Sequence, residues 1–335
     1  MISPDLPAEL RAAFDAKLQG VSRSDAAARA ALISQTYRDG GGSAGIRTET
    51  DALAYALVRM PATYAAVTAS LNALYEIAPH FKPSSLLDVG AGPGTAAWAA
   101  TETFPSLQAV ALLDTNGALR RLALDLAGSS TRLRNMSYAS GEARAALADA
   151  EPADLVVASY MIGEMNEAER NVLAELMWQK TRDTLLVIEP GTPTGYAKIL
   201  ALRAQLIAAG AHVAAPCPHD NACPLVAPDW CHFTQRLARS RAHKQIKAAE
   251  LPYEDEKFIY VALTRAPVVQ HRARVLAQPV VTKIAVTAKL CTDNGVVGAV
   301  APRRDKTAYA RFRKYRWGDI AFEAGTTSAE YVPSE

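Results

Sequence analysis

Three of the four cysteines in this 335-residue chain lie within fifteen residues of one another. They are Cys217, Cys223 and Cys231, in a stretch that reads CPHDNACPLVAPDWCHF, and the fourth, Cys291, follows sixty positions later. Thiolates bind zinc and iron–sulfur clusters, and prolines stiffen an irregular loop so that ligands keep a fixed direction. Because Cys291 is distant in the sequence, a joint site would have to be closed by the fold.

The spacing of these cysteines does not match a zinc finger, because no two of them are separated by two residues. Four thiolates could hold either a tetrahedral zinc ion or an iron–sulfur cluster, of which we favour the cluster. Either His219 or His232 could replace a cysteine or hydrogen-bond to a sulfur. Buried free thiols are the alternative without a metal, but free core cysteines prefer apolar strands and helices. We therefore expect all four cysteines to bind one metal centre.

A glycine-rich loop in the stretch LLDVGAGPGTAAWAA forms the second candidate site. It places Asp88, Gly90, Gly92 and Gly94 at the end of a predicted strand and just before a predicted helix. Glycines permit a tight turn and a close approach of backbone to ligand, and the helix N-terminus offers free N–H donors. Asp114 ends the next predicted strand, where its carboxylate could accept both hydroxyls of a ribose. The pattern predicts a nucleotide-type cofactor pocket rather than a purely structural turn.

Short apolar runs around these sites alternate with segments long enough for helices. The runs are SSLLDVG, LQAVALLD, PADLVVASY and DTLLVIEP, and KFIYVALT at 257–264 is expected to be a later strand. This alternation predicts a parallel sheet covered by helices on both faces.

Other elements are expected on either side of this sheet. Residues 5–37 predict two amphipathic helices, and 49–80 predict a helical stretch that Pro61 kinks or splits. Residues 281–300 alternate apolar and polar side chains around the turn sequence Asp-Asn-Gly at 293–295, which predicts a β-hairpin.

The composition is that of an ordinary globular protein, with 50% hydrophobic and 21% charged residues. No apolar run approaches the roughly 20 residues that a membrane helix needs. The N-terminal stretch MISPDLPAELRAAFDAKL lacks the pattern of a signal peptide, and its early acids disfavour an organellar transit peptide. These features predict a cytoplasmic monomer with no membrane partner.

The charge is distributed unevenly along the chain. Between Arg265 and Trp317, twelve lysines and arginines stand against two acids, whereas the whole chain carries a net charge of +2. Aromatic residues, among them Tyr309, Phe312 and Tyr315, are interleaved with these cations. The segment favours a polyanionic partner, nucleic acid before membrane, over a charged face that binds nothing. With a predicted helix after Cys231, it supplies the expected RNA-binding residues: Arg236, Arg239, Arg241, Lys244, Arg303, Arg304, Arg311, Arg313, Lys314 and Arg316.

The glycine loop resembles the D-x-G-x-G-x-G signature of class I S-adenosylmethionine-dependent methyltransferases, although dinucleotide-binding folds have a similar glycine pattern. The resemblance covers about residues 84–264 and implies a Rossmann-like, seven-stranded, mostly parallel sheet. It also implies that Asp88 lies close to the amino-acid end of S-adenosylmethionine and that Asp114 binds its ribose.

The catalytic motif of such enzymes is not recognisable. Tyr160 is the aromatic after the fourth predicted strand, and we expect it to contact the cofactor, but the proline pair and amide of amino-methyltransferases are missing. No cysteine lies nearby to act as a nucleophile on cytosine. Glu164 and Glu189 could act as bases, but glutamates at helix starts more often complement the helix dipole.

Four stretches resemble the methyltransferase-like small-ribosomal-subunit assembly proteins, which occur in mitochondria and have bacterial relatives. They are RMPATYAAV from Arg59, LLVIEPGTPTGY, CPHDNACPL with WCHFTQRLARSRAHK, and KLCTDNG with YARFRKYRWGD. The resemblance covers roughly 45–320. It implies a 4Fe–4S cluster on the four cysteines and association with the small ribosomal subunit or its rRNA.

The leading hypothesis is therefore an rRNA-binding assembly factor of the small subunit that binds S-adenosylmethionine and a 4Fe–4S cluster, with rRNA methylation left open. The alternatives are an active methyltransferase on a small molecule or protein with structural Zn²⁺, and a redox- or iron-sensing RNA-binding protein. Three parts are expected. They are an N-terminal helical region at 1–82, a methyltransferase-like domain at 83–265 with a cysteine-containing insertion at 212–250, and a basic β-rich subdomain and tail at 266–335.

Overall fold

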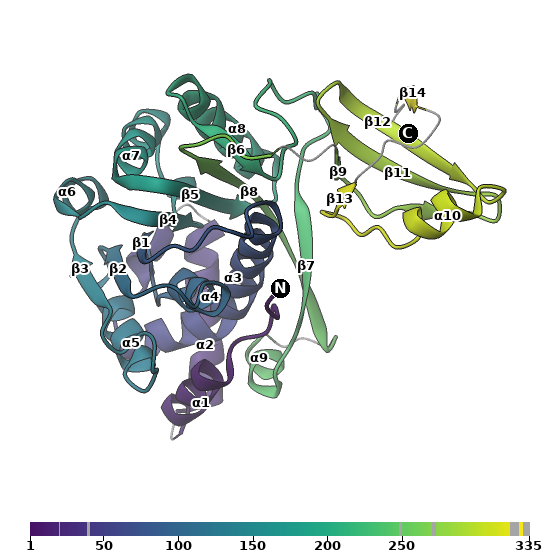
Figure 1. The fold of residues 1–335 in the computed structure, drawn as a ribbon. Coiled ribbons are helices and arrows are strands. Elements are labelled where there is room, and N and C mark those ends of the chain that lie inside the picture. The colour runs from purple at the N-terminus through teal and green to yellow at the C-terminus, as the bar shows by residue number, and fades with distance from the viewer. Residues whose placement is uncertain (20, 39–40, 248–249, 270–272, 322–327, 331–335) are drawn as a thin grey trace.

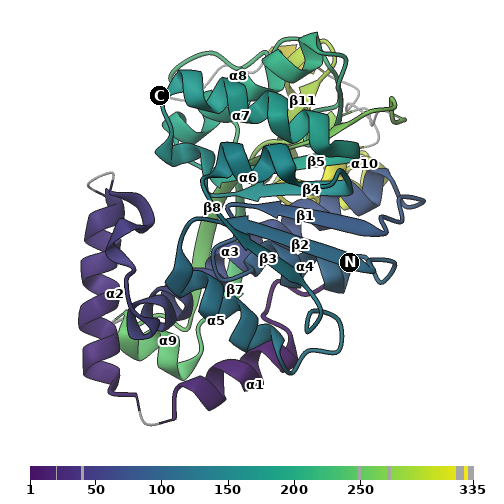
Figure 2. The same cartoon turned by 90° about the vertical axis from the view of Figure 1, so that its left-hand side faces the viewer.

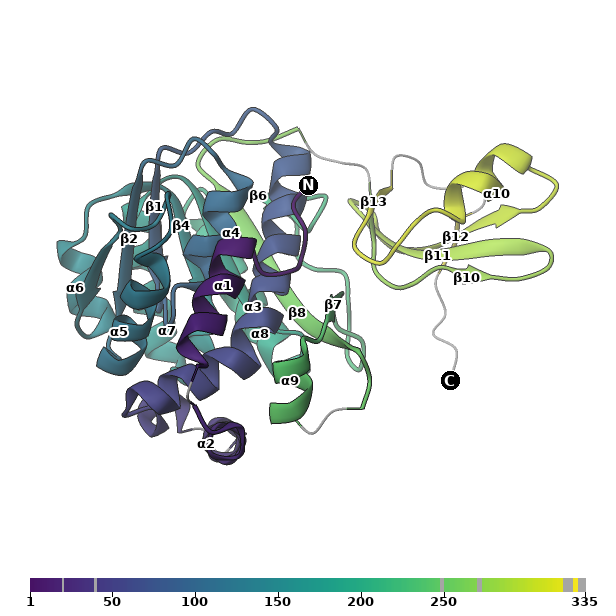
Figure 3. The same ribbon diagram turned by 90° about the horizontal axis from the view of Figure 1, so that it is seen from below.

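The computed structural model describes residues 1–19, 21–38, 41–247, 250–269, 273–321 and 328–330. An α/β body contains most of these residues, and a smaller β-rich part projects from one side of it (Figure 1, Figure 3). Among the described residues, no helix is both long and apolar enough to cross a membrane.

The body is built on a sheet with the strand order β3-β2-β1-β4-β5-β8-β6, and β7 pairs with β8 outside this path. Strands β1 to β5 pair in parallel, whereas β8 is antiparallel to its neighbours. The mostly parallel sheet predicted from the sequence is confirmed, with one strand more than the expected seven among the described residues. The bounds are β1 (Ser85–Val89), β2 (Ala109–Asp114), β3 (Ser137–Ser140), β4 (Ala153–Ser159), β5 (Thr181–Pro190), β6 (His212–Ala215), β7 (Phe233–Ala238) and β8 (Tyr253–Thr264).

Helices cover both faces of this sheet (Figure 2). One face carries α3, α4 and α5, and the other carries α6, α7 and α8. The chain order reverses between β1 and β4, so the crevice at their carboxyl ends is the switch point where such sheets bind ligands. The bounds are α3 (Glu49–Ile77), α4 (Thr95–Thr103), α5 (Gly117–Ala127), α6 (Ala143–Asp149), α7 (Glu167–Lys180) and α8 (Pro193–Ala208), with a short 3₁₀ turn, η2 (Ile162–Glu164).

Helix α3 begins with a capping box, in which Thr48 accepts from the backbone of Asp51 and Asp51 accepts from the backbone of Thr48. It continues through Pro61, so the proline does not split it as the sequence suggested it could. The residues around this proline, Met60 and Ala62 among them, are buried, and α3 packs against α4 and β8. This packing offsets the hydrogen bond that proline cannot donate.

The helices before α3 follow the sequence-based prediction. They are α1 (Ala8–Lys17) and α2 (Arg23–Arg38), followed by a 3₁₀ turn, η1 (Gly42–Gly45). The side chain of Asn116 donates to the backbone oxygens of Ser43 and Ile46, and so holds this turn against the start of α5.

The C-terminal part has its own sheet, with the strand order β13-β9-β11-β12-β14 and with β10 paired to β11. Strands β11 and β12 form the predicted hairpin, in which Thr292 pairs with Gly295. A separate core of small and aromatic side chains, including Ala288, Phe312 and Tyr315, lies between this sheet and α10. The bounds are β9 (Ala273–Val275), β10 (Val280–Val281), β11 (Ala285–Thr292), β12 (Gly295–Pro302), α10 (Lys306–Phe312), β13 (Ile320–Ala321) and β14 (Ser328–Glu330).

The helix predicted directly after Cys231 is wrong. Residues 233–238 form β7, and the helix α9 (Arg241–Ile246) begins only later. Phe233 and Leu237 are both buried. Because positions i and i+4 share a face in a strand as well as in a helix, the apolar pattern did not distinguish the two. Pairing of Phe233 with Phe258 on β8 settles the conformation as a strand.

Candidate functional site

A cavity of about 1100 Å³, partly open to solvent, lies at the carboxyl ends of β1, β2 and β4. Four of the predicted cofactor residues line it: Gly90, Gly92, Asp114 and Tyr160. The cavity is therefore at the switch point of the sheet, where the glycine loop leads into α4.

The glycine loop is shaped by residues in the left-handed region of backbone space, with φ of 70° at Gly90 and 81° at Gly94. A side chain at Gly90 would also place its Cβ 2.7 Å from that of Met161, which is closer than packed carbons approach. Gly94 caps α4 and does not line the cavity. Its contribution is to the turn itself.

Asp114 ends β2 with its carboxylate already fixed in direction. Its Oδ2 accepts from the backbone N–H of Gly92 at 2.8 Å, and its Oδ1 accepts from that of Asn116 at 2.7 Å. Each oxygen has a second lone pair that can accept from a ligand hydroxyl. The residue therefore ties the loop to the strand and still presents an acceptor to the cavity.

Asp88 lies on β1, behind the glycine loop. Its side chain is fully buried on β1 and does not line the cavity. Neither oxygen has a partner with regular hydrogen-bond geometry. Burial raises the pKa of this carboxyl from 3.8 to about 7, an increase that the backbone N–H of Ala97 only partly counters. The structure thus shows a buried acid behind the loop.

Tyr160 adopts φ of 56°, which is unusual for a residue with a side chain. Its hydroxyl donates to Glu256 at 2.9 Å, and its backbone N–H donates to Ile188. Arg59, which the sequence did not single out as a site residue, lies over its ring at 6.0 Å and 3.8 Å from Glu256. Strained residues held by such partners concentrate at functional sites.

A second cavity of about 2030 Å³, also partly open, adjoins the first. Both are lined by Arg59, Tyr160 and Glu164, so the two spaces share a wall. Glu189, at the end of β5, is buried, lines the second cavity and accepts from the backbone N–H of Ile162 at 3.1 Å. Burial raises the pKa of Glu164, and it raises that of Glu189 to about 7.

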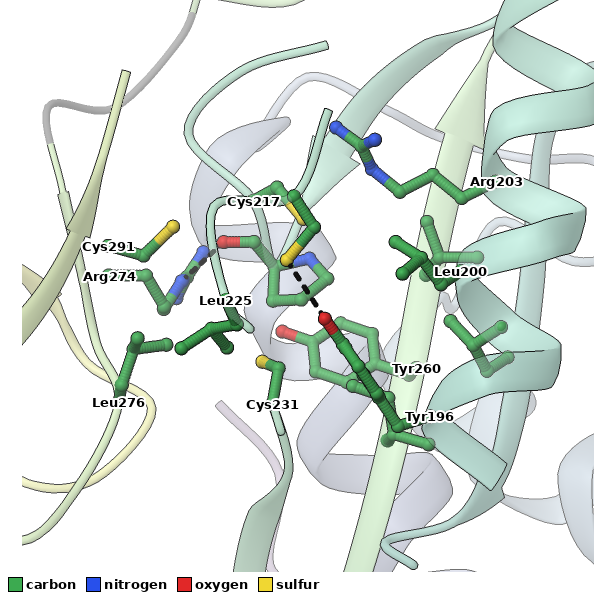
Figure 4. Close-up of a pocket in the computed structure, with 15 residues that line it drawn as sticks. Tyr196, Leu200, Arg203, Cys217, Leu225, Cys231, Tyr260, Arg274, Leu276 and Cys291 are labelled. Carbon is green, nitrogen blue, oxygen red and sulfur yellow. Dashed lines mark hydrogen bonds between the residues drawn. The ribbon is translucent and has the colours of Figure 1, made fainter. Parts of the chain in front are cut away.

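The four cysteines line one pocket at the junction of the body with the C-terminal part (Figure 4). Cys217 follows β6, Cys231 precedes β7, and Cys291 lies on β11. In Figure 4 the side chains of these three residues extend toward a common space. The fold thus brings together residues from separate segments, as a joint site would require.

The thiols of this pocket influence one another. Burial raises the pKa of Cys231 well above its ordinary value, and the neighbouring cysteines add to this effect. Burial and the neighbouring cysteines together raise the pKa of Cys291 to about 12. The hydroxyl of Tyr196 lies 3.2 Å from Sγ of Cys223, and Nε2 of His219 lies 3.8 Å from Sγ of Cys291. Within the described residues, no three His, Cys, Asp or Glu side chains converge so as to hold a single metal ion.

The predicted RNA-binding residues before residue 250 are partly engaged in ion pairs. Arg236 forms two hydrogen bonds to Asp255, at 2.8 and 2.7 Å, and Arg239 forms two to Glu254, at 3.1 and 3.0 Å. The expectation that these cations lie together on a helix is therefore wrong, because they belong to β7 and the turn after it. Arg241 and Lys244 are on α9.

The predicted residues of the C-terminal part lie at the end of β12 and around α10, far from α9 (Figure 1, Figure 3). Two sets of cations, rather than one continuous surface, result from this arrangement. The exposed members are Arg303, Arg304, Arg313, Lys314 and Arg316, and Arg311 is half-buried. Of the interleaved aromatics, Phe312 and Tyr315 are buried in the core and cannot stack on a nucleic-acid base.

The strand order, the glycine loop and the cavity at the switch point define a methyltransferase-like protein of the class I fold. The family described as "Mitochondrial small ribosomal subunit Rsm22" matches residues 49–322. The chain belongs to this family, and the resemblance to methyltransferase-like assembly proteins of the small subunit is confirmed.

Two curated relatives carry related descriptions. "Ribosome assembly protein METTL17, mitochondrial" from Homo sapiens is 28% identical over 293 residues, covering 82% of this chain and 63% of that protein. "Rsm22-cox11 tandem protein 2, mitochondrial" from Schizosaccharomyces pombe is 26% identical over 329 residues, covering 82% of this chain and 44% of that protein. The chain thus spans less than two thirds of the length of either relative.

These descriptions contradict the predicted cytoplasmic location, because the family and both relatives are named as mitochondrial.

Solved structures share the general arrangement at low similarity. Magnesium protoporphyrin IX methyltransferase from Synechocystis with bound SAM matches with a TM-score of 0.39 and 11% identity, over 69% of this chain and 90% of that chain. Precorrin-6y C5,15-methyltransferase from Geobacter metallireducens matches with a TM-score of 0.39 and 12% identity, over 58% of this chain and 84% of that chain.

Proposed function

We propose that this protein is an assembly factor of the small ribosomal subunit that binds rRNA, S-adenosylmethionine and a 4Fe–4S cluster. The observation that carries the proposal is the pocket at the junction of the two sheets, which cysteines from separate segments line together. Such a cluster would supply a redox-sensitive link between the body and the basic C-terminal part. We retain the division at 82/83 and 265/266, and the monomeric state, as parts of the proposal.

The chemistry of the pocket supports a cluster over zinc. Zinc with four thiolates at about 2.3 Å requires sulfurs that converge on one point. The described residues offer no such convergent group, although all four thiols border the same space. A cluster has a wider cage, because each thiolate binds a different iron.

Support for S-adenosylmethionine comes from the cavity at the carboxyl ends of β1, β2 and β4. The fixed carboxylate of Asp114 suits ribose hydroxyls, and the loop at Gly90 and Gly92 lets the backbone approach a ligand closely. Asp88, buried on β1 behind the loop, is retained as a residue close to the amino-acid end of the cofactor.

Support for rRNA comes from the family and from the exposed cations around α10. Contacts from such side chains to phosphates give salt-sensitive binding with little sequence preference. Arg236 and Arg239 are expected to contribute less, because carboxylates already neutralise them.

The test is an absorption spectrum of protein purified without oxygen, with iron, sulfide and zinc measured on the same sample. A broad band at roughly 400 nm with about four irons and four sulfides per chain is the expected result. RNA binding would then be compared between cluster-containing and stripped protein at two salt concentrations. One zinc per chain without the band would refute the cluster, and folded protein without metal would refute both metal centres.

The second cavity favours another candidate, an active methyltransferase. It adjoins the cofactor cavity and presents Glu164 and Glu189, and burial raises the pKa of both carboxyls. The pKa of Glu189 is raised to about 7, which suits a carboxyl that exchanges protons near neutral pH. Transfer of labelled methyl groups to RNA or protein fractions, lost in Glu189→Gln, would support this candidate. If wild-type protein transfers no label, the cavity does not serve methyl transfer to these acceptors.

A further inference from the structure

The cysteine pocket contains two arginines that are almost completely inaccessible to solvent. Arg203 on α8 is 3% exposed and Arg274 on β9 is 1% exposed, and both line the pocket. No aspartate or glutamate is among the described residues of its lining. Buried guanidinium groups without an anion are costly, so this arrangement calls for a negatively charged partner.

Hydrogen bonds account for only part of each guanidinium group. Arg274 donates from Nε to the oxygen of Pro216 and from Nη1 to that of Gly318, both at 2.8 Å. Arg203 donates from Nη2 to the oxygen of His219 at 2.7 Å. Nη2 of Arg274 and Nε of Arg203 are buried and have no hydrogen-bond partner. Each arginine therefore keeps an N–H group for a partner.

Carboxylates outside the lining do not supply this partner. Arg274 acts on the pKa of Glu76 and of Asp319, lowering each against the larger effect of burial. Neither carboxylate forms an ion pair with it among the described residues. These two carboxylates therefore offset part of the charge of Arg274 from outside the pocket, and the described lining itself contains no carboxylate.

The two arginines also hold the chain on both sides of Cys217. The carbonyl that receives Arg274 belongs to the residue before this cysteine, and the one that receives Arg203 lies two residues after it. Arg274 pairs directly with Cys291 across β9 and β11, and directly paired residues point to the same face of a sheet. One arginine thus comes with the body and the other with the C-terminal part.

We propose that Arg203 and Arg274 are the charge-compensating residues of the cysteine pocket, which balance a dianionic four-thiolate cofactor and position the backbone around Cys217. Four thiolates with a doubly charged metal core carry two negative charges, which the two guanidinium groups match. The inference rests on the proposed function, because it takes the cofactor as given.

The test uses full-length protein purified without oxygen, with Arg203→Met, Arg274→Met and the charge-retaining Arg274→Lys. The matched control is Arg265→Met, since Arg265 also donates to two backbone oxygens, those of Trp178 and Thr181, but lies outside the pocket. The readouts are the chelator concentration that removes half the iron and the midpoint reduction potential. Circular dichroism verifies that each variant is folded.

Each Met variant is expected to release iron at a chelator concentration about tenfold lower than wild type. The potential should also become more negative, because a lost positive charge disfavours the added electron. The midpoint reduction potential of Arg274→Lys should lie closer to the wild-type value than that of Arg274→Met. The control Arg265→Met should match wild type in both readouts. If both Met variants keep the wild-type iron retention and midpoint reduction potential, the inference is overturned. If Arg274→Met fails to fold, the result for Arg203→Met decides alone. Wild-type protein without iron refutes the proposed cluster instead, and if it holds zinc, the same chelator comparison decides the arginine proposal.

Discussion

The buried carboxyl of Asp88 should make the stability of the protein fall as the pH rises, and Asp88→Asn should remove this dependence. Burial raises the pKa of this carboxyl from 3.8 to about 7 in the folded state. Folding therefore favours the protonated carboxyl. The contribution of this group to the free energy of unfolding is complete below the unfolded pKa of 3.8 and is lost as the pH rises to the folded pKa of about 7. The difference between the two pKa values corresponds to about 4 kcal/mol.

Asparagine has nearly the shape of aspartic acid but cannot ionise. Urea denaturation measures the free energy of unfolding of both proteins at each pH. The value for Asp88→Asn minus the value for wild type should increase by about 1.4 kcal/mol per pH unit between pH 4 and 7. Above pH 7 the gain should level off, once folded wild-type protein also ionises. Asp149→Asn, at an exposed position on α6, is the control. A difference between Asp88→Asn and wild type that stays constant from pH 5 to 8 would contradict the argument.

Three further substitutions test the glycine loop and the ion pairs of β8. Gly90→Ala should lower the free energy of unfolding by about 1–3 kcal/mol and weaken S-adenosylmethionine binding, because its Cβ would meet Met161 at 2.7 Å. Calorimetry with and without the cofactor measures both effects. An affinity equal to that of wild type would argue against the cavity as the binding site. Glu254→Gln should cost about 3 kcal/mol in urea denaturation, since this largely buried carboxylate pairs with more than one cation. Asp255→Asn, which breaks the exposed pair with Arg236, should cost less than about 1 kcal/mol, and equal costs would refute the distinction by burial.

The central sheet could be predicted because its signals are local. Each apolar run ended at a turn signal, and the glycine loop lay between a strand and a helix. The failures at 233–238 and at Pro61 have a different cause. The spacing of Phe233 and Leu237 fits the periodicity of a helix as well as that of a strand, and only pairing with β8 selects the strand. Pro61 disfavours a continuous helix locally, and burial of its neighbours overrides that preference.

The sites depended on contacts that no local pattern contains. Counting cations suggested one basic surface, but Arg236 meets Asp255 because β7 and β8 pair in that register. Arg203 and Arg274 looked like ordinary charged residues, since nothing in the sequence shows that they are buried beside the cysteines. Cys291 was the exception, because its distance from the other three already required closure by the fold.

Helix α8 joins the two candidate sites. Near its start, Lys198 lines the cavity beside Glu189, whereas Tyr196 and Arg203 line the cysteine pocket. The cysteine loop also contacts the turn before this helix, because the indole N–H of Trp230 donates to the backbone oxygen of Gly191 at 3.1 Å. A change that moves the cysteine loop must therefore act on the same helix that borders the second cavity. Since close-packed interiors transmit displacements, the cysteine pocket and the second cavity are mechanically connected through α8.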